Sequence, residues 1–197
     1  MPALPPLILA SASPRRAELL RGAGQEFRVA PVDGDERWHP GEAPAAYAAR
    51  VARAKAALAV PHHPEALILA ADTTVWLDAA AAPIGKPGDR DEAAATLRAL
   101  MGAAAHHVTT AFVIADTRGP EVTWLERQVT TRVHMRLLDD AELAAYLDAD
   151  DWRDKAGGYG IQSRAAGLVT RIEGSYTAVV GLPLAEVLVA LRDLGAR

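Results

Sequence analysis

Apolar and polar residues follow two different spacings along the chain. Short apolar runs rich in β-branched residues predict strands, and apolar positions repeating every three or four residues predict amphipathic helices. The expected strands are residues 7–10, 27–32, 67–71, 75–77 (forming a hairpin with Ile84), 107–115, 122–137 and 168–172. The expected helices are residues 14–20, 44–59, 89–101, 140–147 and 183–194.

The order of these elements indicates the fold class. Strands alternate with helices, and the long runs at 107–115 and 122–137 interrupt them as an antiparallel pair. This order predicts an α/β fold with a mixed sheet. The chain has 197 residues, contains no internal repeat and has no stretch that resembles a linker, so we expect a single domain over 1–197.

Composition excludes several classes of protein. Half of the residues are hydrophobic and 23% are charged, which is typical of a globular protein. Cysteine is absent, which excludes disulfides, thiol nucleophiles and cysteine metal sites. The net charge of -4 argues against a nucleic-acid polymer as partner. No apolar run approaches the ~20 residues of a membrane helix. Residues 1–9 lack a basic leader, so we expect a cytoplasmic protein without a signal peptide.

The basic residues are unevenly divided between arginine and lysine. Of the 21, only Lys55, Lys86 and Lys155 are lysines. A bias this strong towards arginine suggests that the remaining lysines are needed as compact ammonium groups. Lys55 lies in the apolar stripe of the helix 44–59, where simple snorkelling of the side chain is the alternative explanation.

The segment Ser11-Ala12-Ser13-Pro14-Arg15-Arg16 joins the first strand to the first helix. Ser13 is expected to cap this helix and Pro14 to occupy its first position. A helix N-terminus with two serine hydroxyls and two arginines suits an anion. A plain capped helix with surface arginines is the alternative.

Carboxylates follow two of the expected strands. Asp72 comes directly after the strand 67–71, and Asp35-Glu36 follow the strand 27–32. A carboxylate at such a strand end can hold a metal ion or accept a proton from water. A turn-forming aspartate and a solvated acidic turn are the alternatives. Three lysines and two arginines match the charge of a nucleoside triphosphate, which usually also carries a divalent metal ion held by carboxylates.

Several short segments between residues 7 and 192 form one ordered set. They are Ser11-Ala12-Ser13-Pro14-Arg15-Arg16, Asp35-Glu36, Lys55-Ala56, Ala71-Asp72-Thr73, Gly85-Lys86-Pro87, Asp154-Lys155-Ala156-Gly157-Gly158-Tyr159-Gly160-Ile161-Gln162, Gly174-Ser175-Tyr176 and Val180-Gly181-Leu182-Pro183-Leu184. In these segments the chain resembles the Maf family of nucleoside triphosphate pyrophosphatases. The common order and spacing of the segments make the resemblance specific, and all three lysines fall on motif positions. The resemblance implies a mixed, curved central sheet with flanking helices, two lobes around a cleft, and a homodimer.

The resemblance also implies metal-dependent hydrolysis of a nucleoside triphosphate to monophosphate and pyrophosphate. By motif position Asp72 corresponds to the proton acceptor, and Glu36 and Asp72 to the ligands of Mg²⁺, with Mn²⁺ or Co²⁺ as alternatives. The phosphate-binding positions are Ser11, Ser13, Arg16, Lys55, Lys86 and Lys155. Three further positions, Arg15, Thr73 and Gln162, resemble the subgroup that cleaves dTTP and UTP. A glutamine amide can pair with the N3–H and O4 edge that uracil and thymine share.

Three functions therefore compete. The first is a dTTP/UTP pyrophosphatase that removes nucleotides from the pool, with a possible link to arrest of cell division. The second is a purine enzyme similar to inosine triphosphate pyrophosphatase. The third is a non-catalytic nucleotide-binding regulator of septation, which would bind UTP without releasing pyrophosphate.

Overall fold

A computed structural model describes residues 5–196. The described residues form one six-stranded sheet with the strand order β2-β1-β3-β4-β5-β6. The strands are β1 (Leu7–Leu9), β2 (Arg28–Val29), β3 (Leu67–Trp76), β4 (His106–Asp116), β5 (Thr123–Met135) and β6 (Val169–Glu173). Strand β1 pairs in parallel with β2 and β3, and every later pair is antiparallel. The expected mixed sheet with flanking helices is confirmed.

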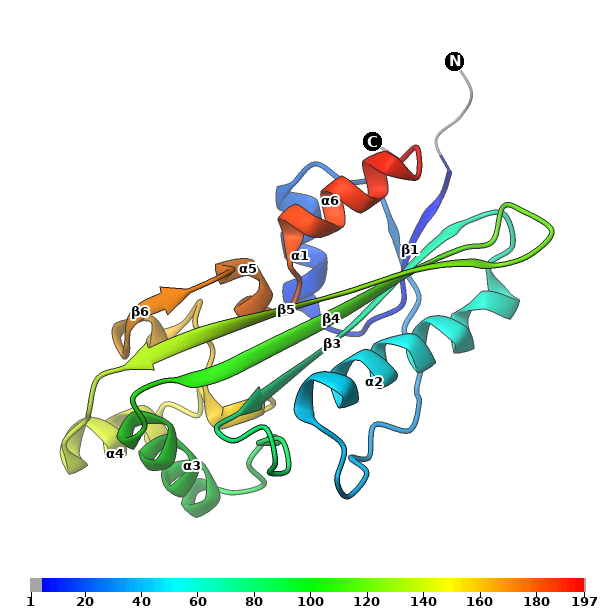
Figure 1. The fold of residues 1–197 in the computed structure, drawn as a ribbon. Helices are drawn as coiled ribbons and strands as arrows, with labels where there is room; N and C mark the ends of the chain where they lie inside the picture. The colour runs from blue at the N-terminus through cyan, green and yellow to red at the C-terminus, as the bar shows by residue number, and fades with distance from the viewer. Residues whose placement is uncertain (1–4, 197) are drawn as a thin grey trace.

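Helices cover both faces of this sheet. They are α1 (Pro14–Gly22), α2 (Pro44–Ala59), α3 (Arg90–Gly102), α4 (Asp140–Asp148), α5 (Tyr176–Val180) and α6 (Leu184–Asp193). Figure 1 shows α2 along one face, α1 and α6 on the opposite face, and α3 with α4 at the end where β4 begins. None of the helices described is long and apolar enough to cross a membrane.

Strand β3 explains why the core has two layers. Leu67 and Leu69 pack with α1 and α6, whereas Ile68 and Ala70 pack with the alanines of α2. A strand buried on both faces reads as a continuous apolar run, as this one does. A third apolar cluster joins α3 and α4 to the far ends of β4 and β5.

Two strand boundaries differ from the sequence prediction. Strand β2 has only two residues, because it pairs with the three-residue β1 at the sheet edge. Strand β3 does not end at Ala71, because β4 pairs with it without interruption from Leu67 to Trp76. The prediction that Asp72 follows the strand is therefore wrong: Asp72 lies within β3, opposite Ala111.

Short elements account for the remaining differences. Helix α5 and three 3₁₀ turns were not predicted from the sequence. The turns are η1 (Val60–His62), η2 (Ala156–Gly158) and η3 (Arg164–Gly167). The expected hairpin after β3 is reduced to a single antiparallel bridge between Val75 and Ile84. Of the amino-terminal segment that we expect not to be a signal peptide, residues 1–4 lie outside the described residues.

Candidate active site

One cavity of about 990 Å³ opens between α2, the end of β1 and the loop that carries η2. All eleven residues to which the family resemblance assigns a site role line it, whereas the other candidate carboxylate, Asp35, lies outside it and pairs with Arg37. The eleven are Ser11, Ser13, Arg15, Arg16, Glu36, Lys55, Asp72, Thr73, Lys86, Lys155 and Gln162. Residues separated by up to 151 positions in the chain therefore share one cavity.

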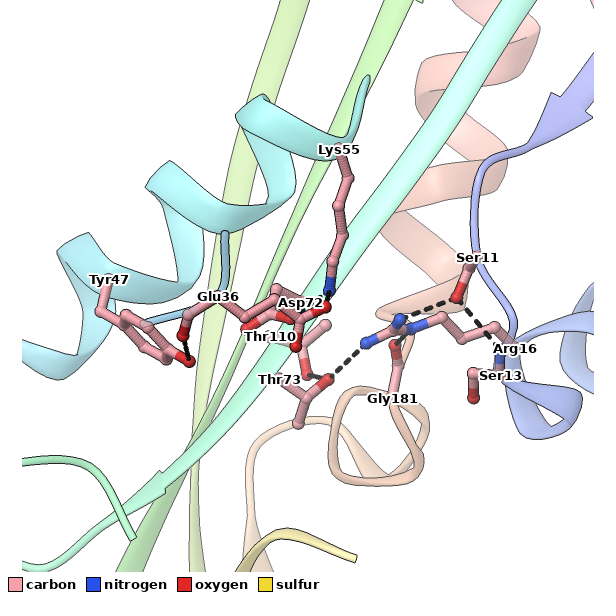
Figure 2. A network of polar contacts seen from close by, with 10 residues as sticks. All are labelled: Ser11, Ser13, Arg16, Glu36, Tyr47, Lys55, Asp72, Thr73, Thr110 and Gly181. Atoms are coloured by element: carbon pink, nitrogen blue, oxygen red, sulfur yellow. Dashed lines mark hydrogen bonds and ion pairs between the residues drawn. The ribbon is translucent and has the colours of Figure 1, made fainter. Parts of the chain in front are cut away.

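The acidic part of the cavity is organised around Lys55. This lysine extends from α2 towards β3, where its ammonium lies 2.8 Å from Asp72 Oδ1 (Figure 2). The same ammonium lies 2.7 Å from Glu36 Oε1. Lys55 therefore holds the two carboxylates near one another and reduces their repulsion. The helical stripe predicted Lys55 to be sheltered, and it is buried, as is Asp72.

Burial controls the proton affinity of Asp72. Loss of hydration raises the pKa of this carboxyl above its ordinary value, although the positive charges of Lys55 and Arg16 oppose the rise. The pKa of a buried carboxyl rises because water no longer stabilises its ionised form. Asp72 is consequently a stronger base than an exposed aspartate.

Arg16 is fixed by three separate parts of the fold. Its Nε donates to the carbonyl of Gly181 at 2.8 Å, and its Nη1 donates to Ser11 Oγ at 2.9 Å. Its Nη2 donates to Thr73 Oγ1 at 3.2 Å (Figure 2). Desolvation lowers the pKa of Arg16, and the charge of Asp72 partly offsets that effect. Since a guanidinium carries five N–H groups, two remain for a ligand.

The start of α1 differs in detail from the expected cap. Ser13 occupies the N-cap position before Pro14, but its side chain makes no capping hydrogen bond. Instead, the backbone N–H of Ser13 donates to Ser11 Oγ at 3.3 Å. Ser11 Oγ thus accepts from Ser13 and from Arg16, which leaves its own hydrogen free to donate to a ligand.

Lys155 is turned towards its own loop. Its ammonium donates to the backbone carbonyl of Asp151 and lies 3.4 Å from the Asp151 carboxylate. The other oxygen of that carboxylate accepts from Ser163 Oγ at 2.6 Å. Asp151 therefore holds both ends of the segment that carries Lys155 and Gln162.

Three of the predicted residues keep their polar ends free. Within residues 5–196, the side chains of Arg15, Lys86 and Gln162 make no hydrogen bond or ion pair. All three line the cavity. Their charges and amide are thus available to a ligand without breaking a contact inside the protein.

Several residues that support the cavity were not predicted from the sequence. The hydroxyl of Tyr47 donates to the backbone carbonyl of Glu36 at 2.7 Å. The hydroxyl of Tyr159 lies 2.7 Å from Nε2 of the buried His106. Asp151 and Tyr47 carry no signal in a single sequence, because an acidic turn residue and a helix tyrosine are ordinary surface features.

The donor chemistry of the cavity fits a magnesium-like ion. Among the described residues, no cluster of three or more histidine, cysteine or carboxylate side chains could hold a metal ion. Asp72 and Glu36 nevertheless supply two neighbouring carboxylates, joined through Lys55. Mg²⁺ is commonly bound by one or two carboxylates together with substrate phosphates and water. The residues present therefore fit such an ion only when a phosphate ligand completes the site.

Comparisons of sequence with known proteins agree on one family. The family described as "Maf-like protein" matches residues 6–194. A protein of Hyphomonas neptunium named "dTTP/UTP pyrophosphatase" is 48% identical over the full length of both chains. Proteins with the same name from Roseobacter denitrificans and Hahella chejuensis are 47% and 42% identical, covering 96% and 97% of this chain and 97% and 93% of theirs. This chain matches a solved HAM1 protein from Coxiella burnetii over 96% of its own length and 100% of that protein, at 17% identity and with a TM-score of 0.44.

Proposed function

Because this chain belongs to the Maf family, we propose that it hydrolyses dTTP and UTP to the nucleoside monophosphate and pyrophosphate. The observation that carries the proposal is the convergence of a buried carboxylate, Asp72, with five cationic side chains on one cavity. The names of relatives that match nearly the whole chain support the same substrates. We expect this hydrolysis to remove dTTP and UTP from the nucleotide pool.

Asp72 is the proposed proton acceptor. A water molecule attacks the α-phosphorus, Asp72 takes the proton from that water, and the bond between the α-phosphorus and the bridging oxygen breaks, so that pyrophosphate leaves. The raised pKa of Asp72 increases its strength as a base at the pH where it is still ionised. Lys55 holds Oδ1 of Asp72 at 2.8 Å, so the other oxygen, Oδ2, is the proposed acceptor of the proton.

Cationic and hydroxyl side chains from several elements are the proposed ligands of the triphosphate. Arg16 offers its two remaining N–H groups, and Ser11 offers its free hydroxyl hydrogen. Lys55 uses two of its three N–H groups on carboxylates and keeps one for a phosphate oxygen. Lys86 has its ammonium free, Lys155 reaches the phosphates by leaving Asp151, and Ser13 adds a hydroxyl. Together they stabilise the charge that develops on the leaving pyrophosphate.

Asp72 and Glu36 are the proposed ligands of a divalent ion, Mg²⁺ or alternatively Mn²⁺ or Co²⁺. When bound, such an ion lowers the pKa of water and neutralises phosphate charge. Lys55 already draws these two carboxylates together, which prepares them to share a ligand.

Arg15, Thr73 and Gln162 are the proposed residues for base selection. The free amide of Gln162 can accept from N3–H and donate to O4 of uracil or thymine. The proposed enzyme acts in the cytoplasm on a nucleoside triphosphate as a homodimer of single domains over residues 1–197, without a nucleic-acid or membrane partner.

The proposal is tested by a panel of pyrophosphate release. The purified protein is incubated with dTTP, UTP, CTP, ITP and modified pyrimidine triphosphates, in Mg²⁺, Mn²⁺ or Co²⁺. Fastest turnover of dTTP and UTP is expected. Preference for ITP would instead identify a purine enzyme, and tight UTP binding without pyrophosphate would identify a non-catalytic binding protein.

A further inference from the structure

A buried threonine that lies behind the cavity connects three of its elements. Thr110 on β4 is opposite Thr73 on β3 in the register of the sheet, and it is fully buried. Its Oγ1 lies 2.6 Å from the carbonyl of Ala178 on α5. The same oxygen lies 2.9 Å from Thr73 Oγ1 (Figure 2). Thr110 is not among the residues that line the cavity.

The chemistry of these groups determines the direction of each hydrogen bond. The carbonyl of Ala178 can only accept, so the single hydroxyl hydrogen of Thr110 is donated to it. Thr110 Oγ1 can then only accept from Thr73, so the hydroxyl of Thr73 donates its hydrogen to Thr110. The guanidinium of Arg16 can only donate, and it donates to Thr73 Oγ1. The chain of donors therefore runs from Arg16 through Thr73 and Thr110 to Ala178.

This direction limits what Thr73 can offer to a ligand. Its hydrogen is committed to the protein interior, and one of its lone pairs is used by Arg16. One lone pair is left on a side chain that is only partly buried and lines the cavity. Towards the cavity Thr73 is consequently a hydrogen-bond acceptor and never a donor.

We propose that Thr110 is a positioning residue for base selection, which acts by keeping Thr73 an acceptor. This inference rests on the proposed function. Uracil and thymine present a donor at N3, whereas cytosine presents an acceptor at the same atom. A fixed acceptor on Thr73 that shares this N3–H with the amide oxygen of Gln162 favours the former, because two acceptors facing each other leave both unpaired. Without Thr110, the hydroxyl of Thr73 can rotate and donate into the cavity, and this discrimination is lost.

The test compares Thr110→Val with a matched variant, Thr109→Val. Thr109 is the neighbouring fully buried threonine on β4, and its hydroxyl contacts Thr130 and Trp76 rather than the cavity. The ratio of kcat/KM for UTP to that for CTP is expected to fall about tenfold in Thr110→Val. It should stay at the wild-type value in Thr109→Val, and Thr110→Ser should restore it because serine keeps the hydroxyl.

Thr73→Val keeps the proposal falsifiable if Thr110→Val does not fold. Thr73 is partly exposed, so its loss is tolerated more easily. The UTP-to-CTP ratio should fall in Thr73→Val, and adding Thr110→Val should lower it no further. An unchanged ratio in Thr73→Val, or an equal fall in Thr110→Val and Thr109→Val, overturns the positioning role. Failure of the wild-type protein to release pyrophosphate from any triphosphate would instead overturn the proposed function.

Discussion

Asp72 meets two opposing requirements at a single residue. Burial makes its carboxylate a better base, but the same burial favours the protonated form, which cannot accept a proton. Lys55 and Arg16 resolve this conflict, because their charges stabilise the ionised form without restoring water around it. The ion pair with Lys55 therefore contributes more to reactivity than to stability. In a buried ion pair, the cost of removing both charges from water offsets most of their attraction.

Replacing Asp72 by Asn tests this residue directly. Asn keeps the size and hydrogen-bonding capacity of the side chain but cannot accept a proton. We expect kcat for UTP to fall about 10²- to 10⁴-fold, while calorimetry shows that UTP still binds. Turnover within a factor of a few of the wild type would remove Asp72 from the proposed mechanism.

His106 predicts a pH dependence of stability that is separate from catalysis. Burial lowers the pKa of this histidine to about 4, whereas the unfolded chain titrates near 6.5. As the pH falls from 6.5 to 4, His106 binds a proton in the unfolded chain but stays largely unprotonated in the folded protein. The free energy of unfolding should therefore decrease by about 3 kcal/mol over this range through His106 alone, and the contribution is absent above pH 6.5.

Urea unfolding at pH 7 and at pH 4.5 measures this effect. His106→Gln keeps a polar group near the Tyr159 hydroxyl but does not titrate, so its stability should fall less between the two values than that of the wild type. His62→Gln, at an exposed position on η1, is the matched control and should behave as the wild type does. A wild-type slope in His106→Gln would contradict the assignment.

At the scale of elements, a single glycine sets the path from β6 into α5. Gly174 has φ +129°, and a Cβ there would lie 2.8 Å from Thr131 Oγ1. Only glycine adopts this conformation without strain. The close approach lets the backbone of Ser175 bond to Thr131 Oγ1 at 3.0 Å and so fixes α5 on the sheet.

Gly174→Ala is expected to lower the free energy of unfolding by about 2 kcal/mol or more, through backbone strain and overpacking. Gly102→Ala is the matched control, because Gly102 ends α3 and nothing lies within 4 Å of an added Cβ. The control should be neutral or slightly stabilising, since alanine favours the helix. Equal stability of the two variants in urea unfolding would show that Gly174 is not constrained.

Elements with local signals could be predicted from the sequence, and elements defined by distant partners could not. Helix α2 has the predicted bounds because Pro44 marks its start, and α4 begins after the Asp139 capping box. The extension of β3 past Asp72 depends on pairing with β4, some forty residues later. A strand predicted from the local apolar run alone therefore ended too early. Helix α5 is too short to show a period.

The residues of the candidate site also divide into those that the sequence reveals and those that only the fold reveals. The three lysines could be found because they stand out against an arginine-rich composition, and all three line the cavity. Thr110 could not be found, since its role depends on a carbonyl 68 residues away and on the direction of a hydrogen bond. Composition and motifs identify groups that meet a ligand, but not the groups that orient them.

At the scale of the whole molecule, the cavity brings together charged side chains from segments far apart in the chain. Five cations (Arg15, Arg16, Lys55, Lys86 and Lys155) line it together with five carboxylates (Asp33, Glu36, Asp72, Asp151 and Asp154). Lys55 and Lys155 are paired with three of these carboxylates, so the attraction for an anion comes mainly from Arg15, Lys86 and the two remaining N–H groups of Arg16. The elements that supply these cations belong to different layers of the fold, and a ligand that contacts all of them ties those layers together.

A bound triphosphate should therefore stabilise the entire molecule, and the stabilisation should depend on cavity cations rather than on total charge. In the Asp72→Asn background, which slows turnover, UTP at a hundred times its Kd should add about 3 kcal/mol and raise the Tm by roughly 5–10 °C. At the same UTP concentration, adding Lys86→Gln should reduce this rise, because Lys86 has a free ammonium in the cavity. Adding Arg98→Gln should not reduce it, because Arg98 is exposed on α3 and pairs with Asp140 away from the cavity. Thermal unfolding with and without UTP at two salt concentrations measures all three variants, and equal shifts in the two double variants would contradict a cavity that recognises phosphate through these cations.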